Sequence, residues 1–494
     1  MNYYSTRDSE RKTPKTSAEV IKQGIADDGG LFLPESIPEI SLDFIKEMGT
    51  LPYSERAAKI LSLYLTDYTY EELLDCAQKA YDEGFGDFAA PVSSFIGDDL
   101  RVLELWHGPT CAFKDMALQI MPRLLSLALK KTGEERTAYI LVATSGDTGK
   151  AALEGYKDVD STKIMVFYPE DGVSDMQKMQ MATQEGSNVC VTAIKGNFDD
   201  AQTGVKKIFA DAEAKAKLDK AGSFLSSANS INWGRLAPQI VYYISAYADL
   251  VAEGDIELGE KVDITVPTGN FGNIFAAFLA KKMGLPVNRF ICASNSNNIL
   301  TDFLTTGTYD RNRTFYTTMS PSMDILISSN LERLLYFIAG AEKTTKYMKD
   351  LNEKGVYTVE GDVLDVIKAE FSAYCCDEEN CAKIISKTFD KYSYVCDPHT
   401  AVAVHAAHEY LKNNGKGLKN IVASTASPYK FAADVLTSLG QEIPTDMKEV
   451  LVKLADISKT EIPAPLANLF GKSVRFTKSV EKTHESLINE VLAF

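Results

Sequence analysis

The stretch Ala138-Tyr-Ile-Leu-Val-Ala-Thr-Ser-Gly-Asp-Thr-Gly149 joins an apolar run to a turn rich in glycine. The apolar run predicts a buried strand, and residues 150–155 after the turn predict the start of a helix. The pattern occurs a second time, with a strand over 261–266, a turn over 267–273 and an apolar helix after it. Glycines allow backbone N–H groups to converge, and a helix N-terminus adds partial positive charge. Both turns therefore predict a site for a phosphate or a carboxylate.

The rest of the chain alternates between strands and helices in the same way from about residue 99 onward. Further strands are predicted over 163–168, 188–194, 289–293 and 420–424. Such alternation indicates an α/β fold with open, mostly parallel sheets flanked by helices.

The patterns divide the chain into an N-terminal segment and a larger remainder. Residues 1–98 are rich in helical patterns, whereas residues 99–494 alternate and are long enough to form two α/β lobes. Between about 294 and 394 the pattern becomes helical and polar. The sequence therefore predicts a helix-rich N-terminal domain, a region of two lobes and a helical insertion.

A second informative stretch is His107-Gly-Pro-Thr-Cys-Ala-Phe-Lys-Asp-Met-Ala-Leu-Gln119, in which Lys114 stands among apolar residues. Apolar positions continue from Met116 to Leu125 at roughly helical spacing, so we expect Lys114 at the start of a packed helix. A desolvated lysine can act as a nucleophile and form a Schiff base. The alternative is a lysine whose stem covers a helix while its amine reaches solvent.

Other phosphate-binding motifs fit the two turns poorly. A nucleotide triphosphate loop of the Walker type needs glycine where Thr144 stands and serine or threonine where Ala151 stands. Neither turn contains the full glycine fingerprint of a dinucleotide site. For one turn alone, the competing interpretation is a turn that only connects a strand to a helix, because glycine is common in turns.

The charge balance argues against polyanionic partners. The chain has 494 residues with 52 Lys and Arg against 68 Asp and Glu, and its net charge of −16 opposes attraction to nucleic acid or an anionic membrane. No apolar run approaches the roughly 20 residues of a membrane helix, and the N-terminus lacks a secretory signal. We therefore expect a cytoplasmic protein that acts on a small molecule, with no nucleic-acid and no membrane partner.

The eight cysteines do not resemble an extracellular disulfide framework, so reduced thiols are expected. Cys375, Cys376 and Cys381 lie close in sequence, and Cys396 lies near His399, which raises zinc as an alternative. The paired ligand spacing of zinc sites is missing. We therefore predict no metal site.

Three motifs follow one another along the chain: Phe-Lys-Asp at 113–115, Thr-Ser-Gly-Asp-Thr-Gly at 144–149 and Thr-Gly-Asn-Phe-Gly-Asn at 268–273. This order resembles the threonine synthases, which are pyridoxal-phosphate (PLP) enzymes of fold type II, the tryptophan-synthase-β group. Further motifs similar to those of the family lie at 4–8, 24–34, 230–235, 397–401 and 424–428. The resemblance spans nearly the whole chain, and the extended N-terminal segment is similar to that of the longer bacterial and fungal branch.

The resemblance implies a PLP site around Lys114, which would hold the cofactor covalently. The cofactor phosphate would be held, mainly by backbone N–H groups, in the turn of Gly269, Asn270, Phe271, Gly272 and Asn273. Thr425 would place a neutral hydroxyl beside the pyridine nitrogen and leave that nitrogen largely unprotonated. Asp147 would approach the 3′-oxygen of the cofactor. A helix N-cap is the alternative role for Asp147, because aspartate is favoured there.

The resemblance also implies two contacts with the substrate. The amino acid carboxylate would be received by the turn that contains Thr144, Ser145 and Thr148. Arginine offers forked donors matched to phosphate, and the substrate phosphate would be held by Asn229, Ser230, Asn232 and Arg235. For Arg235, a surface ion pair is the competing interpretation.

The activity implied by the resemblance is the conversion of O-phospho-L-homoserine and water to L-threonine and phosphate, the last step of threonine biosynthesis, by a monomer or small homo-oligomer. The leaving group is on Cγ, so protons must move at Cα and Cβ, and Cγ must regain one. Such chemistry needs a lysine whose pKa lies far below that of a solvated amine. Two alternatives stay open. One is another PLP lyase of fold type II, such as a threonine or serine dehydratase or a cysteine-synthase-like enzyme, and the other is a non-catalytic homologue that binds a phospholigand.

Overall fold

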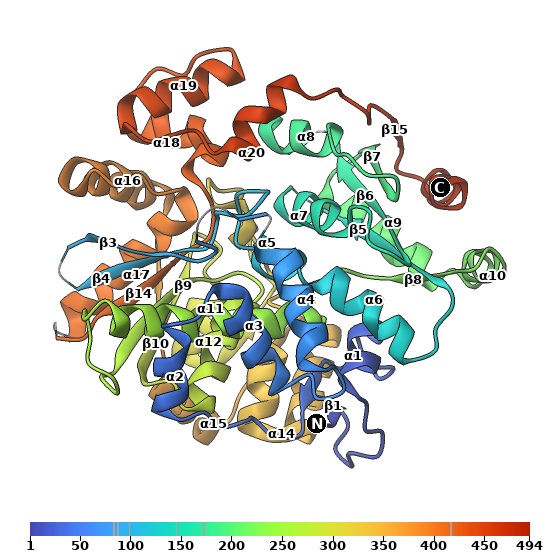
Figure 1. The fold of residues 1–494 in the computed structure, drawn as a ribbon, viewed down its shortest axis with the longest axis horizontal. Coiled ribbons are helices and arrows are strands. Elements are labelled where there is room, and N and C mark those ends of the chain that lie inside the picture. Colours follow the sequence, from blue (N-terminus) through green and yellow to red (C-terminus); the bar gives the residue numbers. More distant parts are fainter. Residues whose placement is uncertain (83, 86–87, 98, 145, 171–172, 415–416) are drawn as a thin grey trace.

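The structure, a computed structural model, describes residues 1–494 except for 83, 86–87, 98, 145, 171–172 and 415–416. Two α/β lobes lie side by side, and a helical N-terminal layer packs against both of them (Figure 1). Among the described residues, no helix is long and apolar enough to cross a membrane.

The N-terminal layer consists of a small antiparallel sheet and four helices. Its strands are β1 (Tyr3–Ser5) and β2 (Phe32–Pro34), and its helices are α1 (Ser17–Gln23), α2 (Leu42–Met48), α3 (Tyr53–Ser62) and α4 (Tyr70–Tyr81). A capping box of Thr16 and Glu19 starts α1. The layer contacts the first lobe through α6 (Met121–Lys131) and the second lobe through α11 (Trp233–Ala252).

The first lobe is built on a parallel sheet with strand order β15-β7-β6-β5-β8. Its strands are β5 (Thr137–Ala143), β6 (Thr162–Pro169), β7 (Val189–Lys195), β8 (Ser223–Ser226) and β15 (Ser479–Glu481). Its helices are α6, α7 (Asp147–Tyr156), α8 (Asp175–Ala182), α9 (Phe198–Ala210), α10 (Ala212–Lys220) and α21 (His484–Ala493). Alternate residues of β5 face opposite layers: Ile140 joins the core that contains α6 and α7, and Tyr139 joins that of α9 and α21. The sheet is therefore buried on both faces, as parallel sheets are.

The second lobe is built on a sheet with strand order β13-β10-β9-β14-β4-β3. Its strands are β3 (Val92–Ile96), β4 (Leu100–Glu104), β9 (Val262–Pro267), β10 (Val287–Ser294), β13 (Phe371–Cys375) and β14 (Asn420–Ser424). The helices packed around it include α11, α12 (Gly272–Met283), α16 (Glu378–Tyr392) and α17 (Pro398–Asn414). All neighbours are parallel except β3 and β4, which pair antiparallel although the predicted boundary at residue 98 separates them.

Up to residue 370, the stretch over 294–394, predicted as a helical insertion, contains three helices and several short elements. They are α13 (Ile299–Thr306), β11 (Thr308–Asp310), the 3₁₀ turn η1 (Pro321–Met323), α14 (Leu331–Lys354), β12 (Val356–Thr358) and α15 (Gly361–Glu370). The same stretch also supplies β13, the edge strand of the second sheet, and α16.

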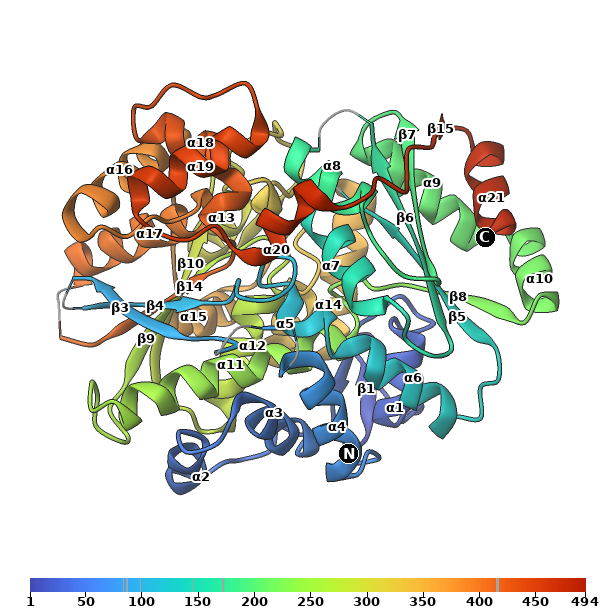
Figure 2. The same cartoon turned by 45° about the horizontal axis from the view of Figure 1, so that its top comes forward.

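The C-terminal segment begins in the second lobe and ends in the first. It forms η2 (Pro428–Phe431), α18 (Ala432–Ser438), α19 (Met447–Ser458), α20 (Ala464–Ala467) and η3 (Asn468–Gly471). It then crosses to the first lobe, where β15 pairs with β7 and α21 packs on α9 (Figure 2). Leu487 and Val491 of α21 are fully buried there.

The predicted α/β class and the six predicted strands are confirmed. One predicted element differs. The helix expected from Lys114 through Leu125 is divided into α5 (Asp115–Leu118) and α6. Pro122 lies in the first turn of α6, where its missing N–H costs no hydrogen bond, so it starts a new helix.

Candidate active site

The candidate site lies where strands of both lobes end. The turns of residues 144–149 and 268–271 follow β5 and β9 directly, and Thr425 follows β14. Ligands in open α/β sheets bind outside the carboxyl ends of parallel strands, which is where these turns lie. Lys114 is fixed beside them, since the N–H of Phe113 donates to the Thr425 carbonyl over 2.8 Å.

The amine of Lys114 is enclosed by protein. Its side chain is only 12% exposed, and Nζ donates to Ser322 Oγ over 3.0 Å. Burial lowers the pKa of Lys114 to about 8, Asp147 opposes that change, and the cations Lys430 and Arg235 add to it. The alternative of a lysine with a solvent-exposed amine is therefore wrong. With this pKa about a tenth of the amine is unprotonated at pH 7, far more than for a solvated lysine, and the unprotonated amine is the form that makes a Schiff base.

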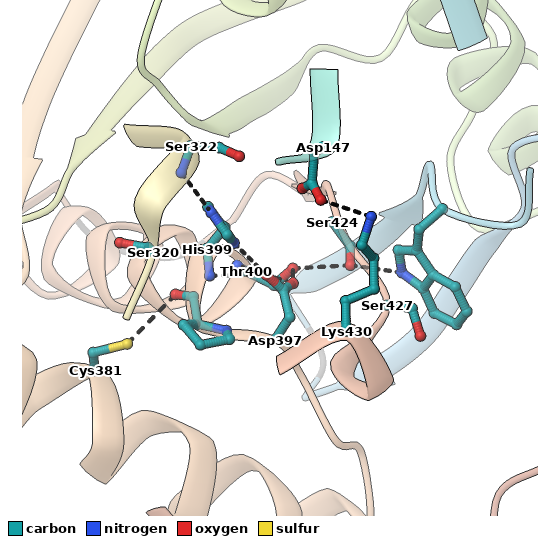
Figure 3. Close-up of polar contacts among 12 residues, drawn as sticks. Asp147, Ser320, Ser322, Cys381, Asp397, His399, Thr400, Ser424, Ser427 and Lys430 are labelled. Atoms are coloured by element: carbon teal, nitrogen blue, oxygen red, sulfur yellow. Dashed lines mark hydrogen bonds and ion pairs between the residues drawn. The ribbon is translucent and has the colours of Figure 1, made fainter. Parts of the chain in front are cut away.

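Asp147 is the first residue of α7 and lies between two lysines. Its Oδ1 lies 2.6 Å from Lys430 Nζ (Figure 3). The same oxygen accepts from Gln177 Nε2 over 2.8 Å, and Oδ2 lies 4.0 Å from Lys114 Nζ. Burial acts to raise the pKa of Asp147, but the two ammonium groups and the Gln177 amide outweigh it and hold that pKa below its ordinary value. The helix N-cap is Gly146, and Asp147 makes no capping bond, so the alternative role for Asp147 is wrong.

Lys430 and Gln177 are site residues that the sequence analysis missed. Lys430 lies in η2 with a fully buried side chain, and its Nζ also donates to the Thr110 carbonyl over 2.9 Å. Gln177 lies on α8. One signal could have pointed to Lys430, because it stands between Tyr429 and Phe431 directly after the motif at 424–428.

The turn that begins α12 presents unpaired N–H donors. Phe271 has φ +60°, in the left-handed region, and α12 begins directly after it. In the part of the chain that the structure describes, none of the backbone N–H groups from Gly269 to Asn273 has an acceptor. The Nδ2 of Asn273 is also buried without a partner. Unpaired donors at a helix N-terminus fit a phosphate group.

Residues of the insertion hold this turn in place. Ser328 Oγ donates to the Gly269 carbonyl over 2.7 Å, and the N and Nδ2 of Asn330 donate to the Asn270 carbonyl over 3.0 and 2.9 Å. A Cβ at Gly269 would lie 2.7 Å from the Ser322 carbonyl oxygen. Gly269 is therefore required because a larger side chain would clash with the insertion, whether or not a ligand is bound. The insertion, whose role could not be predicted from the sequence, forms part of the site.

The turn of residues 144–149 is held by its own threonine. Thr144 Oγ1 accepts from the N–H groups of Gly146 and Gly149 over 3.0 and 2.9 Å. The hydroxyl predicted to receive a substrate carboxylate is therefore already engaged in shaping the turn. Thr148 is half-buried in the first turn of α7, and Ser145 lies outside the described residues.

Arg235 is a buried cation on α11. The residue is 3% exposed, Nη1 donates to the Ala228 carbonyl, and Nε is buried without a hydrogen-bond partner among the described residues. Burial lowers the pKa of Arg235 to about 10. The alternative of a surface ion pair is therefore wrong. A buried guanidinium without a counterion is costly, and an anionic ligand would relieve that cost.

Asn232 is also predicted to hold the substrate phosphate, but both polar atoms of its side chain bond to the protein backbone. Its Oδ1 accepts from the N–H of Gly234 over 2.8 Å as the N-cap of α11, and its Nδ2 donates to the Ile21 carbonyl over 2.9 Å. The Asn232 amide thus joins α11 to the N-terminal layer. Asn229 is exposed and Ser230 is half-buried in the loop that precedes α11.

A buried polar chain leads from Ser322 into the second lobe (Figure 3). Ser322 N donates to His399 Nε2 over 3.2 Å, and His399 Nδ1 lies 2.7 Å from Asp397 Oδ1. Nε2 is therefore the acceptor, and Nδ1 carries the proton. Thr400 continues the chain, since its hydroxyl bonds to Asp397 and lies 2.9 Å from Ser424 Oγ. This network, which the sequence analysis missed, fixes the serine that contacts Lys114.

The zinc alternative finds no support around His399. Both ring nitrogens of His399 are engaged by protein partners. Within the part of the chain that the structure describes, no group of three or more His, Cys, Asp or Glu is arranged to hold a metal ion.

The site has the chemical groups that PLP requires. Lys114 offers an enclosed amine, the turn over 269–273 offers N–H donors for a phosphate, and Thr425 is buried with a hydroxyl that no described group engages. These features, on this fold, are those of the PLP-dependent enzymes of fold type II, and the family model "Pyridoxal-phosphate dependent enzyme" matches residues 89–424. The models "Threonine synthase N terminus" and "Threonine synthase, C-terminal" match residues 2–81 and 400–490. The chain belongs to the threonine synthase family.

Individual relatives agree with this assignment. The chain is 37% identical to threonine synthase of Pseudomonas aeruginosa over 484 residues, which are 97% of this chain and 95% of that protein. It is 41% identical to human threonine synthase-like 1 over 446 residues, which are 87% of this chain, and it spans 59% of the length of that relative. The crystal structure of PLP-bound threonine synthase from Brucella melitensis matches with a TM-score of 0.88 at 35% identity, covering 100% of this chain and 99% of that one. The structure of yeast threonine synthase gives 0.89 at 33% identity, covering 100% and 98%.

Proposed function

We propose that this protein is a threonine synthase that converts O-phospho-L-homoserine and water to L-threonine and phosphate with PLP as cofactor. One arrangement carries the proposal: an enclosed lysine amine of lowered pKa shares its site with a buried arginine that has no described anionic partner. The lysine supports covalent cofactor chemistry on an amino acid. The arginine supports a phosphorylated substrate.

PLP, when bound, supplies an electron sink for carbanion charge on the substrate. Lys114 would anchor the cofactor and move protons at Cα, Cβ and Cγ of the substrate. Its pKa of about 8 suits a group that must both accept and return protons near neutral pH. Ser322 Oγ, 3.0 Å from Nζ, would orient the amine during these transfers.

The remaining residues have separate binding roles in this proposal. The turn over 269–273 would hold the cofactor phosphate, and Thr425 would face the ring nitrogen. Thr148 and the backbone of the turn over 144–149 would receive the substrate carboxylate, since the Thr144 hydroxyl is engaged. Arg235, with Asn229 and Ser230 in the loop before it, would hold the substrate phosphate.

The two alternative functions, another PLP lyase of fold type II and a non-catalytic phospholigand-binding homologue, explain fewer features of the site. A serine or threonine dehydratase acts on a substrate without a phosphate and would leave Arg235 buried and unpaired. A non-catalytic phospholigand-binding homologue would have no use for an enclosed amine of lowered pKa at Lys114.

The test is an assay of both products. Purified protein with PLP should release phosphate and threonine from O-phospho-L-homoserine in equal amounts, and Lys114→Ala should release neither. The variant should also lose the visible absorption band of the bound cofactor. Phosphate release without threonine would refute the proposal, and an unchanged spectrum in Lys114→Ala would remove Lys114 as the anchor.

We also propose that the enzyme works in the cytoplasm as a monomer or small homo-oligomer. All eight cysteines are free thiols, which supports a reducing compartment. Cell fractionation and sedimentation of the purified protein test the two parts of this proposal separately.

A further inference from the structure

Lys430 is a fully buried lysine to which the proposed reaction assigns no role. Its Nζ contacts Asp147 Oδ1 at 2.6 Å and the Thr110 carbonyl at 2.9 Å. A buried ammonium is costly unless it is paired and hydrogen-bonded, so a pair of this kind needs a reason beyond stability. The pair stands next to Lys114, whose Nζ lies 4.0 Å from the other oxygen of the same carboxylate.

We propose that Lys430 is a positioning residue: by holding Oδ1 of Asp147, it limits how strongly Oδ2 of that carboxylate binds the ammonium of Lys114. The proposal rests on the proposed role of Lys114 as the cofactor lysine.

The geometry shows how the restraint works. Lys430 and Gln177 both bind Oδ1 of Asp147, at 2.6 and 2.8 Å, and so fix the carboxylate from one side. Oδ2 stays 4.0 Å from Lys114 Nζ, which is longer than a hydrogen bond. Nζ donates to Ser322 Oγ instead, over 3.0 Å. Without Lys430, the carboxylate could close on Lys114 and form a direct ion pair.

The charges around Lys114 give the direction of each effect. The groups that bear most strongly on it are Asp147, Lys430 and Arg235, together with Asp115, which accepts from the N–H and hydroxyl of Thr110. The Asp397–His399 pair contacts the N–H of Ser322, whose hydroxyl accepts from Lys114. One carboxylate is thus shared by two ammonium groups. Removing Lys430 leaves the carboxylate with one ammonium group, that of Lys114, whereas removing Asp147 leaves Lys114 beside an unpaired cation.

The test measures the titration of the Lys114 amine in the cofactor-free protein. Competitive acetylation with acetic anhydride between about pH 6 and pH 10 brackets the amine's titration, and peptide mass spectrometry reads the pKa of Lys114 directly. Lys430→Met should raise that pKa by about one pH unit or more, the effect of one charge a few ångströms away. The rate at which added PLP binds near neutral pH should fall about tenfold, because about tenfold less amine is unprotonated.

Three further variants set the controls. Asp147→Asn should lower the pKa of Lys114, and Asp147→Asn with Lys430→Met should bring it back toward the unmodified value. Lys430→Arg keeps the charge and should preserve the titration. Lys150→Met removes another buried lysine, one paired with Glu154 at 2.8 Å and not among the groups that bear most strongly on Lys114, and should leave the titration unchanged.

An unchanged or lowered pKa of Lys114 in folded Lys430→Met would overturn the proposal, and so would an equal shift in Lys150→Met. Circular dichroism and thermal melting establish that each variant folds. If Lys430→Met does not fold, Lys430→Gln makes the same test, because its amide can keep the bonds to Asp147 and Thr110 without the charge. The proposed function is tested separately by the product assay. If the variants titrate as expected but no threonine forms, the proposed function is refuted and the proposal for Lys430 is not.

Discussion

At the scale of single residues, the site depends on buried cations that the protein itself pairs only in part. Lys430 has Asp147 as its counterion, whereas Arg235 has a carbonyl partner and an unpaired Nε among the described groups. A guanidinium in this state is stabilised most by a ligand that brings its own negative charge. Lys430 is therefore neutralised within the protein, whereas Arg235 is available to bind an anionic ligand.

Replacing Arg235 by Gln tests this availability. The hydrogen bond of a charged group contributes about 1.5–3 kcal/mol, so kcat/KM for O-phospho-L-homoserine should fall about ten- to hundredfold. The affinity for PLP, measured by fluorescence titration, should change little. Arg136→Gln, which removes a partly exposed arginine, is the matched control and should leave kcat/KM unchanged. Equal losses of substrate use and PLP binding would indicate a structural role for Arg235.

The sequence could predict those candidate site residues that stand together in short motifs. Lys114, the turn over 269–273 and Asp147 stand in short motifs, because a tight turn before a helix needs glycine and adjacent residues. Ser322, His399, Lys430 and Gln177 could not be predicted as partners, because each reaches the site from a different element through tertiary packing. Asn232 shows the converse, since it lies in a family-like motif but its amide caps a helix and binds the N-terminal layer.

At the scale of elements, the insertion acts as a wall of the site. Its η1 places Ser322 against both Lys114 and the turn that begins α12, and the residues before α14 bind the carbonyls of that turn. The helical pattern of this stretch is visible in the sequence. Its contacts are not, because they depend on how the long loop between β11 and α14 folds back over the second sheet.

Gly269→Ala tests the close packing of the insertion on this turn. The new Cβ would lie 2.7 Å from the Ser322 carbonyl oxygen, so the backbone of one segment must shift. Overpacking of this kind costs about 1–3 kcal/mol, and we expect a lower melting temperature together with weaker PLP retention. Gly361→Ala meets no atom within 4 Å and is the control. Weaker PLP retention without any loss of stability would show that the glycine serves the ligand alone.

At the scale of the whole molecule, the chain passes between the lobes three times. It leaves the second sheet after β4, builds the first sheet through β8, returns to build β9 to β14, and comes back as β15 and α21. The alternation of strands predicts two lobes, but it does not predict this last return, because β15 is only three residues long and lacks an apolar run. The pairing of β15 with β7 is a tertiary feature.

Leu487→Ala tests how much the returning helix α21 contributes. Leu487 is fully buried against the first sheet, and loss of a buried leucine side chain costs about 2–5 kcal/mol. The urea concentration at which the first lobe unfolds should fall accordingly. Leu492→Ala on the same helix, at a residue 36% exposed, should have a much smaller effect. Equal midpoints for the two variants would show that α21 does not stabilise the lobe.

The late return of the chain constrains how the protein can be synthesised. Strands β5 to β8 have been synthesised by residue 226, but β15, which pairs with β7, is not made until residues 479–481. Through that interval one border of the nascent first sheet displays unpaired backbone groups, which invite pairing with another chain. Translation arrested before residue 479 should therefore yield more aggregate than translation of the full chain, which sedimentation of the two products measures.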